Sequence, residues 1–232
     1  MIKYLNEKEL NTRIALNFKR LADSAYYQIG EVFAPSTYDW PADKEGRALL
    51  AFVSHYKISG EKIPCMDEMM ERFPSKLNEK GYLGTTRTDV IVEQQLSGHS
   101  WLLRGLCEYY EQFEDEYALD VIKNITENLF MRTKGRYATY PIDRSQKDEG
   151  GVSGSEIGCC NNWILSSDIG CAFMSVDGLS HVYKITKDET VKELLDEMIE
   201  VYLSMQHLQP LLLIQREERI THPLPKIWLI WN

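Results

Sequence analysis

The sequence predicts an all-α protein assembled from helical hairpins, and three observations lead to this prediction. Apolar residues recur every three or four positions along most of the chain, which is the spacing of one buried stripe on a helix. Strand signals are nearly absent, and no proline occurs between Pro74 and Pro141. With 232 residues and 44% hydrophobic content, the chain is long and apolar enough to bury a real core.

The first long helix is predicted from Leu10 to Ile29, where the apolar residues fall on a single stripe. A polar segment with two prolines follows it. Asp43 is then predicted to be the N-cap of a second helix, because its side chain can accept a hydrogen bond from the first turn. The pair Ser59–Gly60 ends this helix.

A third, shorter helix is predicted over residues 66–80, with Pro74 at an end or a kink because proline removes a backbone donor. The sequence GYLG at 81–84 then forms a turn. Two strongly periodic segments, 92–113 and 118–129, predict two further helices.

Residues 134–155 form a polar connection rich in Gly, Asp and Ser, and a loop of this length is usually functional or disordered. Another helix is predicted around residues 160–184. The segment Thr186–Glu189 resembles a capping box that opens a last helix, which carries apolar residues from Val191 to Tyr202.

From about Gln206 the helical period is lost, three prolines appear and the chain ends on WLIW. We therefore predict a helical domain over 1–205 and an atypical tail over 206–232. Two interpretations of the tail remain open. It either packs across the domain or is a frameshifted, non-native terminus.

The charge of the chain limits its partners. A formal charge of −9 and a sequence pI near 5.1 provide no basic face to neutralise phosphates, so we expect neither nucleic acid nor an anionic membrane as a partner. Neutral ligands such as saccharides fit this charge better. No signal peptide is evident and no segment reaches the roughly 18 apolar residues of a membrane span. Five cysteines, an odd number, do not suggest a secreted disulfide framework, so we expect a cytoplasmic protein with reduced thiols.

The stretch GGVSGSEIGCCNNW, residues 150–163, places Glu156 three residues before the adjacent Cys159 and Cys160. Zinc binds thiolates together with carboxylates, and a thiolate is a strong nucleophile. These residues are therefore candidates for both a metal site and a catalytic site. The other interpretation is a turn with two small buried side chains, which is the common fate of intracellular cysteine.

Five further residues are candidates for ligand contact or acid–base chemistry. Asp39 and Trp40 combine a carboxylate with an aromatic face, as sugar sites do, although the same segment can also simply start a helix. His99 lies on an apolar stripe and points either into a cavity or into a satisfied core. Glu93 at a helix start and Glu149 in the long loop are the other candidate carboxylates.

Three elements occur in a defined order along the chain: Gly81-Tyr82-Leu83, then Gly98-His99, then Glu156 with Cys159. With this ordered set, the chain resembles the β-L-arabinofuranosidase-like glycoside hydrolases over roughly residues 8 to 205. The resemblance implies an (α/α)6 toroid. A complete toroid of this kind needs about 350 residues, so the chain is expected to form a partial one.

The resemblance also implies a chemistry. Members of this family cleave furanosides with retention, using a zinc-bound cysteine thiolate as nucleophile and a glutamate as general acid/base. On this chain it assigns Glu156, Cys159 and Cys160 to zinc binding and catalysis. Glu149 is an alternative acid/base, and the substrate is a saccharide.

Other function classes remain open. A partial toroid can be a non-catalytic saccharide-binding or scaffold module. An α-solenoid interaction protein would show a repeat period, and GYLG and GHSW each occur once. Uronide hydrolases and sugar epimerases of toroid type would not need a cysteine pair. An incomplete toroid also exposes apolar helix faces, which predicts a homo-oligomer or low solubility.

Overall fold

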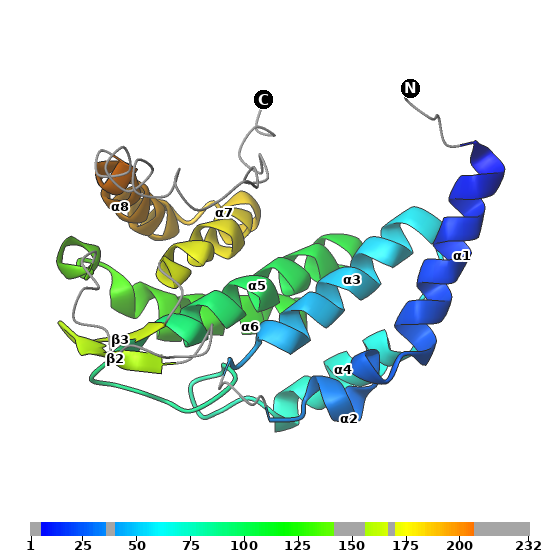
Figure 1. The fold of residues 1–232 in the computed structure, drawn as a ribbon, viewed down its shortest axis with the longest axis horizontal. Helices are drawn as coiled ribbons and strands as arrows, with labels where there is room; N and C mark the ends of the chain where they lie inside the picture. Colours follow the sequence, from blue (N-terminus) through cyan, green and yellow to red (C-terminus); the bar gives the residue numbers. More distant parts are fainter. Residues whose placement is uncertain (1–5, 36–39, 142–155, 167–169, 207–232) are drawn as a thin grey trace, which may run out of the picture.

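The structure, a computed structural model, describes residues 6–35, 40–141, 156–166 and 170–206. These residues are mostly helical, which confirms the all-α prediction at a coarse level (Figure 1). The α-helices are α1 (Glu7–Asp23), α2 (Ile29–Val32), α3 (Asp43–Ser59), α4 (Pro64–Arg72), α5 (Glu93–Phe113), α6 (Glu116–Ile125), α7 (Ser175–Thr186) and α8 (Glu189–Gln206). None of these described helices is long and apolar enough to cross a bilayer.

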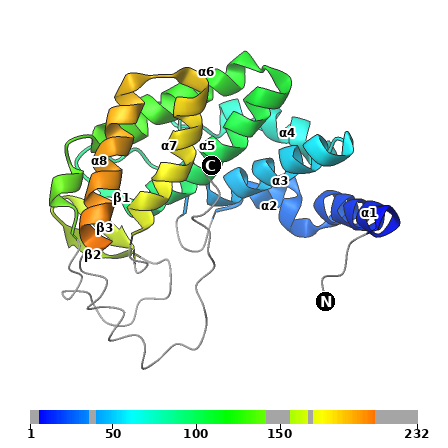
Figure 2. The ribbon, with the colours of Figure 1, turned by 90° about the horizontal axis from the view of Figure 1, so that it is seen from above.

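One small sheet accompanies the helices, although the sequence suggested almost no strands. Its strands are β1 (Ile91–Val92), β2 (Glu156–Cys160) and β3 (Trp163–Ser166), in the order β1-β3-β2. β3 pairs antiparallel with β2 and parallel with β1, which directly precedes α5. The sheet therefore lies at the N-terminal end of α5, as Figures 1 and 2 show.

Three of the helices run in the same direction. Gly98 of α5 lies against Pro41, just before α3, and Gly105 of α5 lies against Gly46 of α3. Later residues of α5 therefore contact later residues of α3, so the two helices are parallel. α7 keeps the same direction, because its register against α5 also advances with the chain: Gly178 donates its N–H to Ser100 Oγ, and Lys184, further along, pairs with Glu111. The N-terminal ends of α3, α5 and α7 therefore point to the same end of the molecule.

The helices α4, α6 and α8 follow the three parallel helices in the chain and complete three helical hairpins. The connections are short: Glu114 and Asp115 join α5 to α6, and Lys187 and Asp188 join α7 to α8. Glu114 and Lys187 both adopt left-handed backbone conformations that end the preceding helix. The helices of each pair also pack together, most extensively α5 with α6 and α7 with α8.

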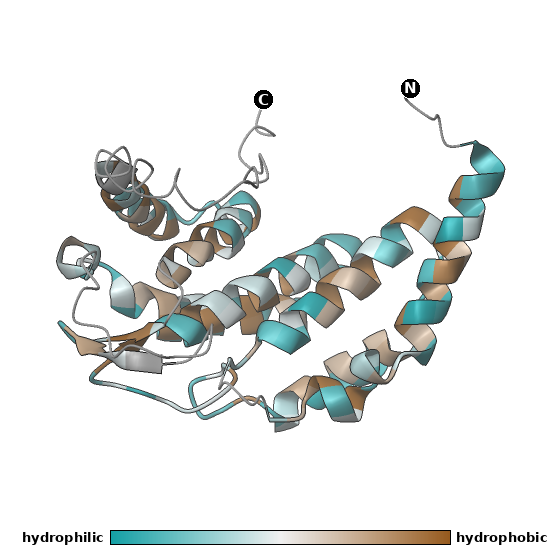
Figure 3. Cartoon of the chain, in the orientation of Figure 1, coloured by the Kyte–Doolittle hydropathy of each residue, from teal (hydrophilic) through white to brown (hydrophobic). Residues whose placement is uncertain are grey.

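α5 is the centre of the fold, since it packs against α3, α6 and α7. Glycines allow the close approach. A Cβ atom on Gly46 would overlap the backbone of Leu102, and a Cβ on Gly98 would overlap the carbonyl oxygen of Pro41. The apolar residues of α3 and α5 fill the core around this contact, and Figure 3 shows them as brown patches on helices that are otherwise mixed in hydropathy.

Two predicted helix boundaries were wrong. The helix predicted from Leu10 to Ile29 breaks after Asp23, where Ser24 adopts an extended backbone and the Gln28 side chain donates to the carbonyl oxygen of Ala22. The helix predicted over 66–80 ends as an α-helix at Arg72, because Pro74 follows within a short 3₁₀ turn.

The helix predicted around 160–184 was also wrong in its first half. Asn161 and Asn162 have φ angles of 51° and 66°, so they form a tight turn between β2 and β3 instead of a helix start. In the described part of this segment, the next helical residues are the 3₁₀ turn Cys171–Met174, after Gly170, and α7 begins at Ser175. The predicted tail, apart from Gln206, lies outside the described residues.

Candidate functional site

The described residues enclose a pocket of about 260 Å³ beside the N-terminal end of α3. Its walls come from the segment after α2, from the start of α3 and from the GYLG turn, and they include Phe33, Trp40, Pro41, Glu45, Lys76 and Leu83. Pockets for drug-sized ligands measure roughly 300–1,000 Å³, so this pocket suits a smaller ligand. Trp40, predicted from the sequence as a ligand contact, lines it.

Glu45 carries the one carboxyl group among the described residues that line the pocket. It lies in the first turn of α3 and is partly buried. Burial raises the pKa of Glu45 from 4.5 to about 7, outweighing nearby backbone N–H groups and Lys44, which lower it. At neutral pH the group is therefore divided between acid and carboxylate, and it can donate or accept a proton.

Two lysines also line the pocket, but the ammonium group of each already interacts with another residue. The Lys44 ammonium donates to the carbonyl oxygen of Glu31 at 2.8 Å and lies 3.4 Å from its carboxylate. The Lys76 ammonium lies 5.7 Å from the centre of the Phe33 ring, a cation–π contact. The pocket thus offers aromatic and apolar walls with one titratable carboxyl group.

His99 lies behind the pocket wall and hydrogen bonds to Leu83, one of the lining residues. Its Nε2 atom accepts a hydrogen bond from the Leu83 N–H at 3.1 Å, and its Nδ1 atom lies 2.7 Å from the carbonyl oxygen of Gln95. Burial lowers the pKa of His99 to about 4, so the ring stays neutral and both nitrogens serve these contacts. His99 is 0% exposed, so the structure gives it an internal supporting position and not a place on the pocket surface.

Glu93, also predicted as a ligand contact, lies inside the protein. It is 0% exposed and opens α5. Its carboxylate accepts hydrogen bonds from the Tyr140 hydroxyl and, at 2.7 Å, from the Ser166 N–H at the end of β3. Glu93 therefore fastens the β2–β3 hairpin and the segment around Tyr140 to the start of α5.

The predicted metal and nucleophile cluster lies on that hairpin. Cys159 pairs with Ile164 and Cys160 with Trp163 in the antiparallel ladder. Successive side chains of a strand point to opposite faces, and accordingly Cys159 is exposed whereas Cys160 packs partly against the core. The two thiols therefore do not fit a single shared zinc ion.

Three other predicted residues have no described side chain. Glu156 is the first residue of β2, but its side chain lies outside the described part of the chain. Asp39 and Glu149 lie outside the described residues altogether. The structure therefore places neither their carboxylates nor their distance from Glu45.

A group of potential metal ligands occurs at the other end of α5. The carboxylates of Glu108 and Glu111 and the imidazole of His181 on α7 lie within 4.8 Å of one another and could hold a metal ion. The sequence reasoning missed both this group and Glu45. The pair Glu108 and Glu111, three positions apart on one helix face, is a signal that a search for i, i+3 ligands would find.

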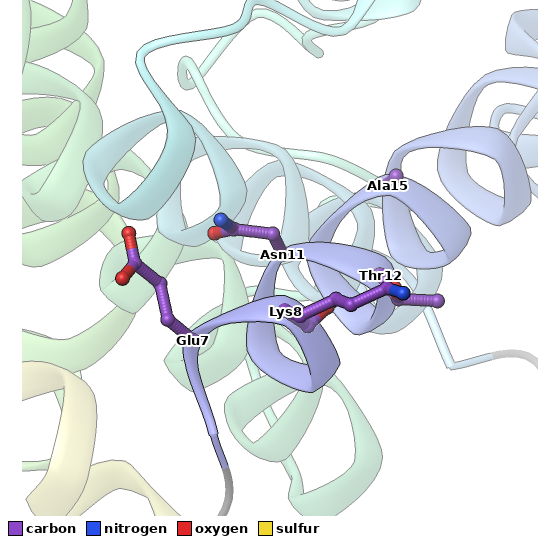
Figure 4. Close-up of a pocket in the computed structure, with 5 residues that line it drawn as sticks. All are labelled: Glu7, Lys8, Asn11, Thr12 and Ala15. Atoms are coloured by element: carbon purple, nitrogen blue, oxygen red, sulfur yellow. The ribbon is translucent and has the colours of Figure 1, made fainter.

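A second hollow lies along α1, and Figure 4 shows the residues around it. All five lining residues, from Glu7 to Ala15, belong to that one helix, so no second element closes the hollow. It is an open helix surface and contributes nothing to the candidate site.

Comparison with known proteins gave no match. No protein-family model matches the chain, and no curated protein and no solved structure is significantly similar to it. The described residues therefore form a mostly helical protein with a small pocket beside the start of α3.

Proposed function

We propose that the protein is carbohydrate-active and binds a neutral saccharide in the pocket formed by Trp40 and Glu45. The observation that carries this proposal is the combination of an indole face and one carboxyl group in a space of about 260 Å³. Sugar rings stack their C–H faces on aromatic side chains, and carboxyl groups bind their hydroxyls.

The surroundings of the pocket support a neutral ligand. Lys44 and Lys76 are already engaged by Glu31 and Phe33, so neither is needed to bind an anion. The acidic chain, with a formal charge of −9, also disfavours anionic ligands.

The three sequence elements of the arabinofuranosidase-like resemblance gather at this end of the fold. Leu83 of the GYLG turn hydrogen bonds to His99, and the hairpin that carries Cys159 is tied to Glu93 at the start of the same helix. Three parallel helices, each followed by a return helix, also form the repeating unit of an (α/α) toroid. We therefore propose that the chain forms part of such a toroid, with its ligand at the helix starts.

As an enzyme, the protein would be a glycoside hydrolase related to the β-L-arabinofuranosidases. Glu45 has the partly protonated carboxyl group that a general acid needs. The catalytic roles of Glu156, Glu149 and a single cysteine remain predictions. Zinc would stabilise a thiolate at neutral pH, but Cys159 and Cys160 face opposite sides of β2 and do not fit one shared ion.

A second candidate function is non-catalytic saccharide binding. The placement of the two thiols favours it, because the pair does not form the metal-bound nucleophile that the hydrolase chemistry requires. In this case the pocket binds a sugar without turnover.

The test measures binding of neutral mono- and oligosaccharides to the full chain. Calorimetry and tryptophan fluorescence detect the binding. Trp40→Ala is expected to abolish binding. The matched control is Trp101→Ala, because Trp101 of α5 does not line the pocket. The Arg47 guanidinium lies 4.2 Å from the centre of the Trp101 ring. No binding to any sugar, or equal losses in both variants, would contradict the proposal.

Hydrolysis of aryl furanosides and pyranosides then separates the two functions. Turnover that is lost in Glu45→Gln while sugar binding persists supports a hydrolase that uses the pocket. Turnover lost in Cys159→Ala or Cys160→Ala supports a thiol nucleophile. Binding without turnover in the unaltered protein leaves the saccharide-binding module.

A further inference from the structure

We propose that Glu108, Glu111 and His181 bind a divalent transition-metal ion, such as zinc, that links α5 to α7. This site lies towards the C-terminal end of α5. Glu108 lies nine positions, or about 13 Å along the helix, beyond His99, which supports the pocket wall, and the two sites share no residue.

The carboxylates are held in a way that leaves one oxygen of each available. Lys57 donates to Glu108 Oε2, and Lys184 lies 2.8 Å from Glu111 Oε1. The other two oxygens have weaker partners: Glu108 Oε1 is 3.7 Å from Arg104, and Glu111 Oε2 is 3.2 Å from His181. The two lysines thus act as outer partners that orient the ligands, as metal sites require.

Arg104 does not have to compete with the ion. Its guanidinium lies 2.5 Å from Asp177 of α7, much closer than to Glu108. When a cation occupies the group, Arg104 can therefore stay with Asp177 while Glu108 Oε1 turns to the metal.

His181 supplies the observation that points to a ligand. The residue is only 8% exposed, and its Nε2 atom makes no well-aligned hydrogen bond to any residue that the structure describes. A buried imidazole beside two carboxylate oxygens is a suitable ligand set for zinc, cobalt or manganese.

The geometry needs only a small adjustment. The ligand atoms lie within 4.8 Å of one another, whereas the ligands of a tetrahedral ion bound at about 2 Å are roughly 3.3 Å apart. Glu111 Oε2 already lies 3.2 Å from His181 Nε2, so the adjustment falls to Glu108, whose side chain is 20% exposed and can move towards the ion. Three protein ligands leave one position for water.

The experiment measures zinc and cobalt(II) binding to the full chain by calorimetry and by the visible spectrum of cobalt. Zinc is expected to bind with one ion per chain and to raise the melting temperature. His181→Gln and Glu111→Gln are expected to weaken binding by more than the about 10–100-fold that outer-partner changes cause. Circular dichroism checks that both variants fold.

Two controls keep the test specific. His55→Gln changes another buried histidine, 3% exposed on α3, and is expected to leave zinc binding unchanged. The double variant Cys159→Ser/Cys160→Ser is expected to retain zinc, and cobalt should show weak bands typical of nitrogen and oxygen ligands. Absence of zinc binding, or binding that survives in His181→Gln and disappears in the cysteine variant, would overturn the proposal.

Discussion

The carboxylate of Glu93 accepts a hydrogen bond from the Ser166 N–H at 2.7 Å, a contact between residues 73 positions apart in the sequence. Both residues are 0% exposed. The same carboxylate also receives the Tyr140 hydroxyl. One buried side chain therefore joins the central helix, the β2–β3 hairpin and Tyr140, which lies within the long polar connection of residues 134–155.

Glu93→Gln is expected to destabilise the protein by about 1–3 kcal/mol, because the amide has one acceptor oxygen for two buried donors. Urea denaturation measures the loss. The control is Glu68→Gln, which breaks an exposed Glu68–Arg72 pair and is expected to cost less than about 1 kcal/mol. If the two changes lower the free energy of unfolding equally, the buried Glu93 carboxylate does not stabilise the fold through these two hydrogen bonds.

The glycine contact between α3 and α5 gives a second prediction. Gly98→Ala is expected to lower the free energy of unfolding by about 1–3 kcal/mol or more, because the new methyl group overlaps the carbonyl oxygen of Pro41. Gly30→Ala is the control, since nothing lies within 4 Å of its Cβ position, and it is expected to be neutral or slightly stabilising. Thermal unfolding of both variants tests the difference.

Glu45 predicts a pH dependence of stability. Its pKa in the folded state is about 7, above the ordinary 4.5, so folding favours the protonated form. The stabilisation is complete below pH 4.5 and is lost as pH rises through about 7. The total change is on the order of 3 kcal/mol.

Glu45→Gln should remove this part of the pH dependence and leave the variant more stable than the parent above pH 7. Urea midpoints of the two proteins, measured from acid to neutral pH, give the difference directly. A difference that does not change with pH would contradict the assigned pKa.

The hairpin turn gives a fourth prediction. Asn162 has a φ angle of 66°, where most side chains are strained by about 1–2 kcal/mol and glycine is not. Asn162→Gly is expected to keep or raise stability, whereas Asn162→Val lowers it. If both variants unfold at the same urea concentration, the turn does not adopt this conformation.

Self-association is the fifth prediction. Leu16 on α1 is 63% exposed and Leu203 on α8 is 52% exposed, at two edges of the proposed partial toroid. Sedimentation velocity is expected to show a homo-oligomer that Leu16→Glu or Leu203→Glu shifts towards monomer. A monomer at all concentrations would contradict the proposed open edges.

The helices with strong periodicity were predictable from the sequence. α5 matches the segment predicted over 92–113, and α3 ends at Ser59, directly before the predicted Gly60, whose φ of 71° favours glycine. The residues that cap the helices were predicted less accurately. Asp188 accepts the hydrogen bond from the Thr190 N–H that starts α8, so the N-terminal cap is Asp188, two residues after the Thr186 that opens the predicted capping box.

The hairpin and the candidate pocket were harder to predict, for a common reason. The sequence EIGCCNNWILS was interpreted through its cysteines, and the two asparagines that set the turn were overlooked. Glu45 was not singled out from the sequence, because desolvation of a carboxyl group depends on neighbours such as Trp40 and Leu83 that only the fold brings together. Helical periodicity gives no information on such contacts.

The shared direction of α3, α5 and α7 also has an electrostatic consequence. Each helix presents the positive end of its backbone dipole, roughly half an elementary charge, at its N-terminus, and here three such ends face the same side. Glu45 and Glu93 each occupy a first turn at this side, within the combined field. In an otherwise acidic protein, the field at this side therefore favours electron-rich oxygen atoms and disfavours cationic groups.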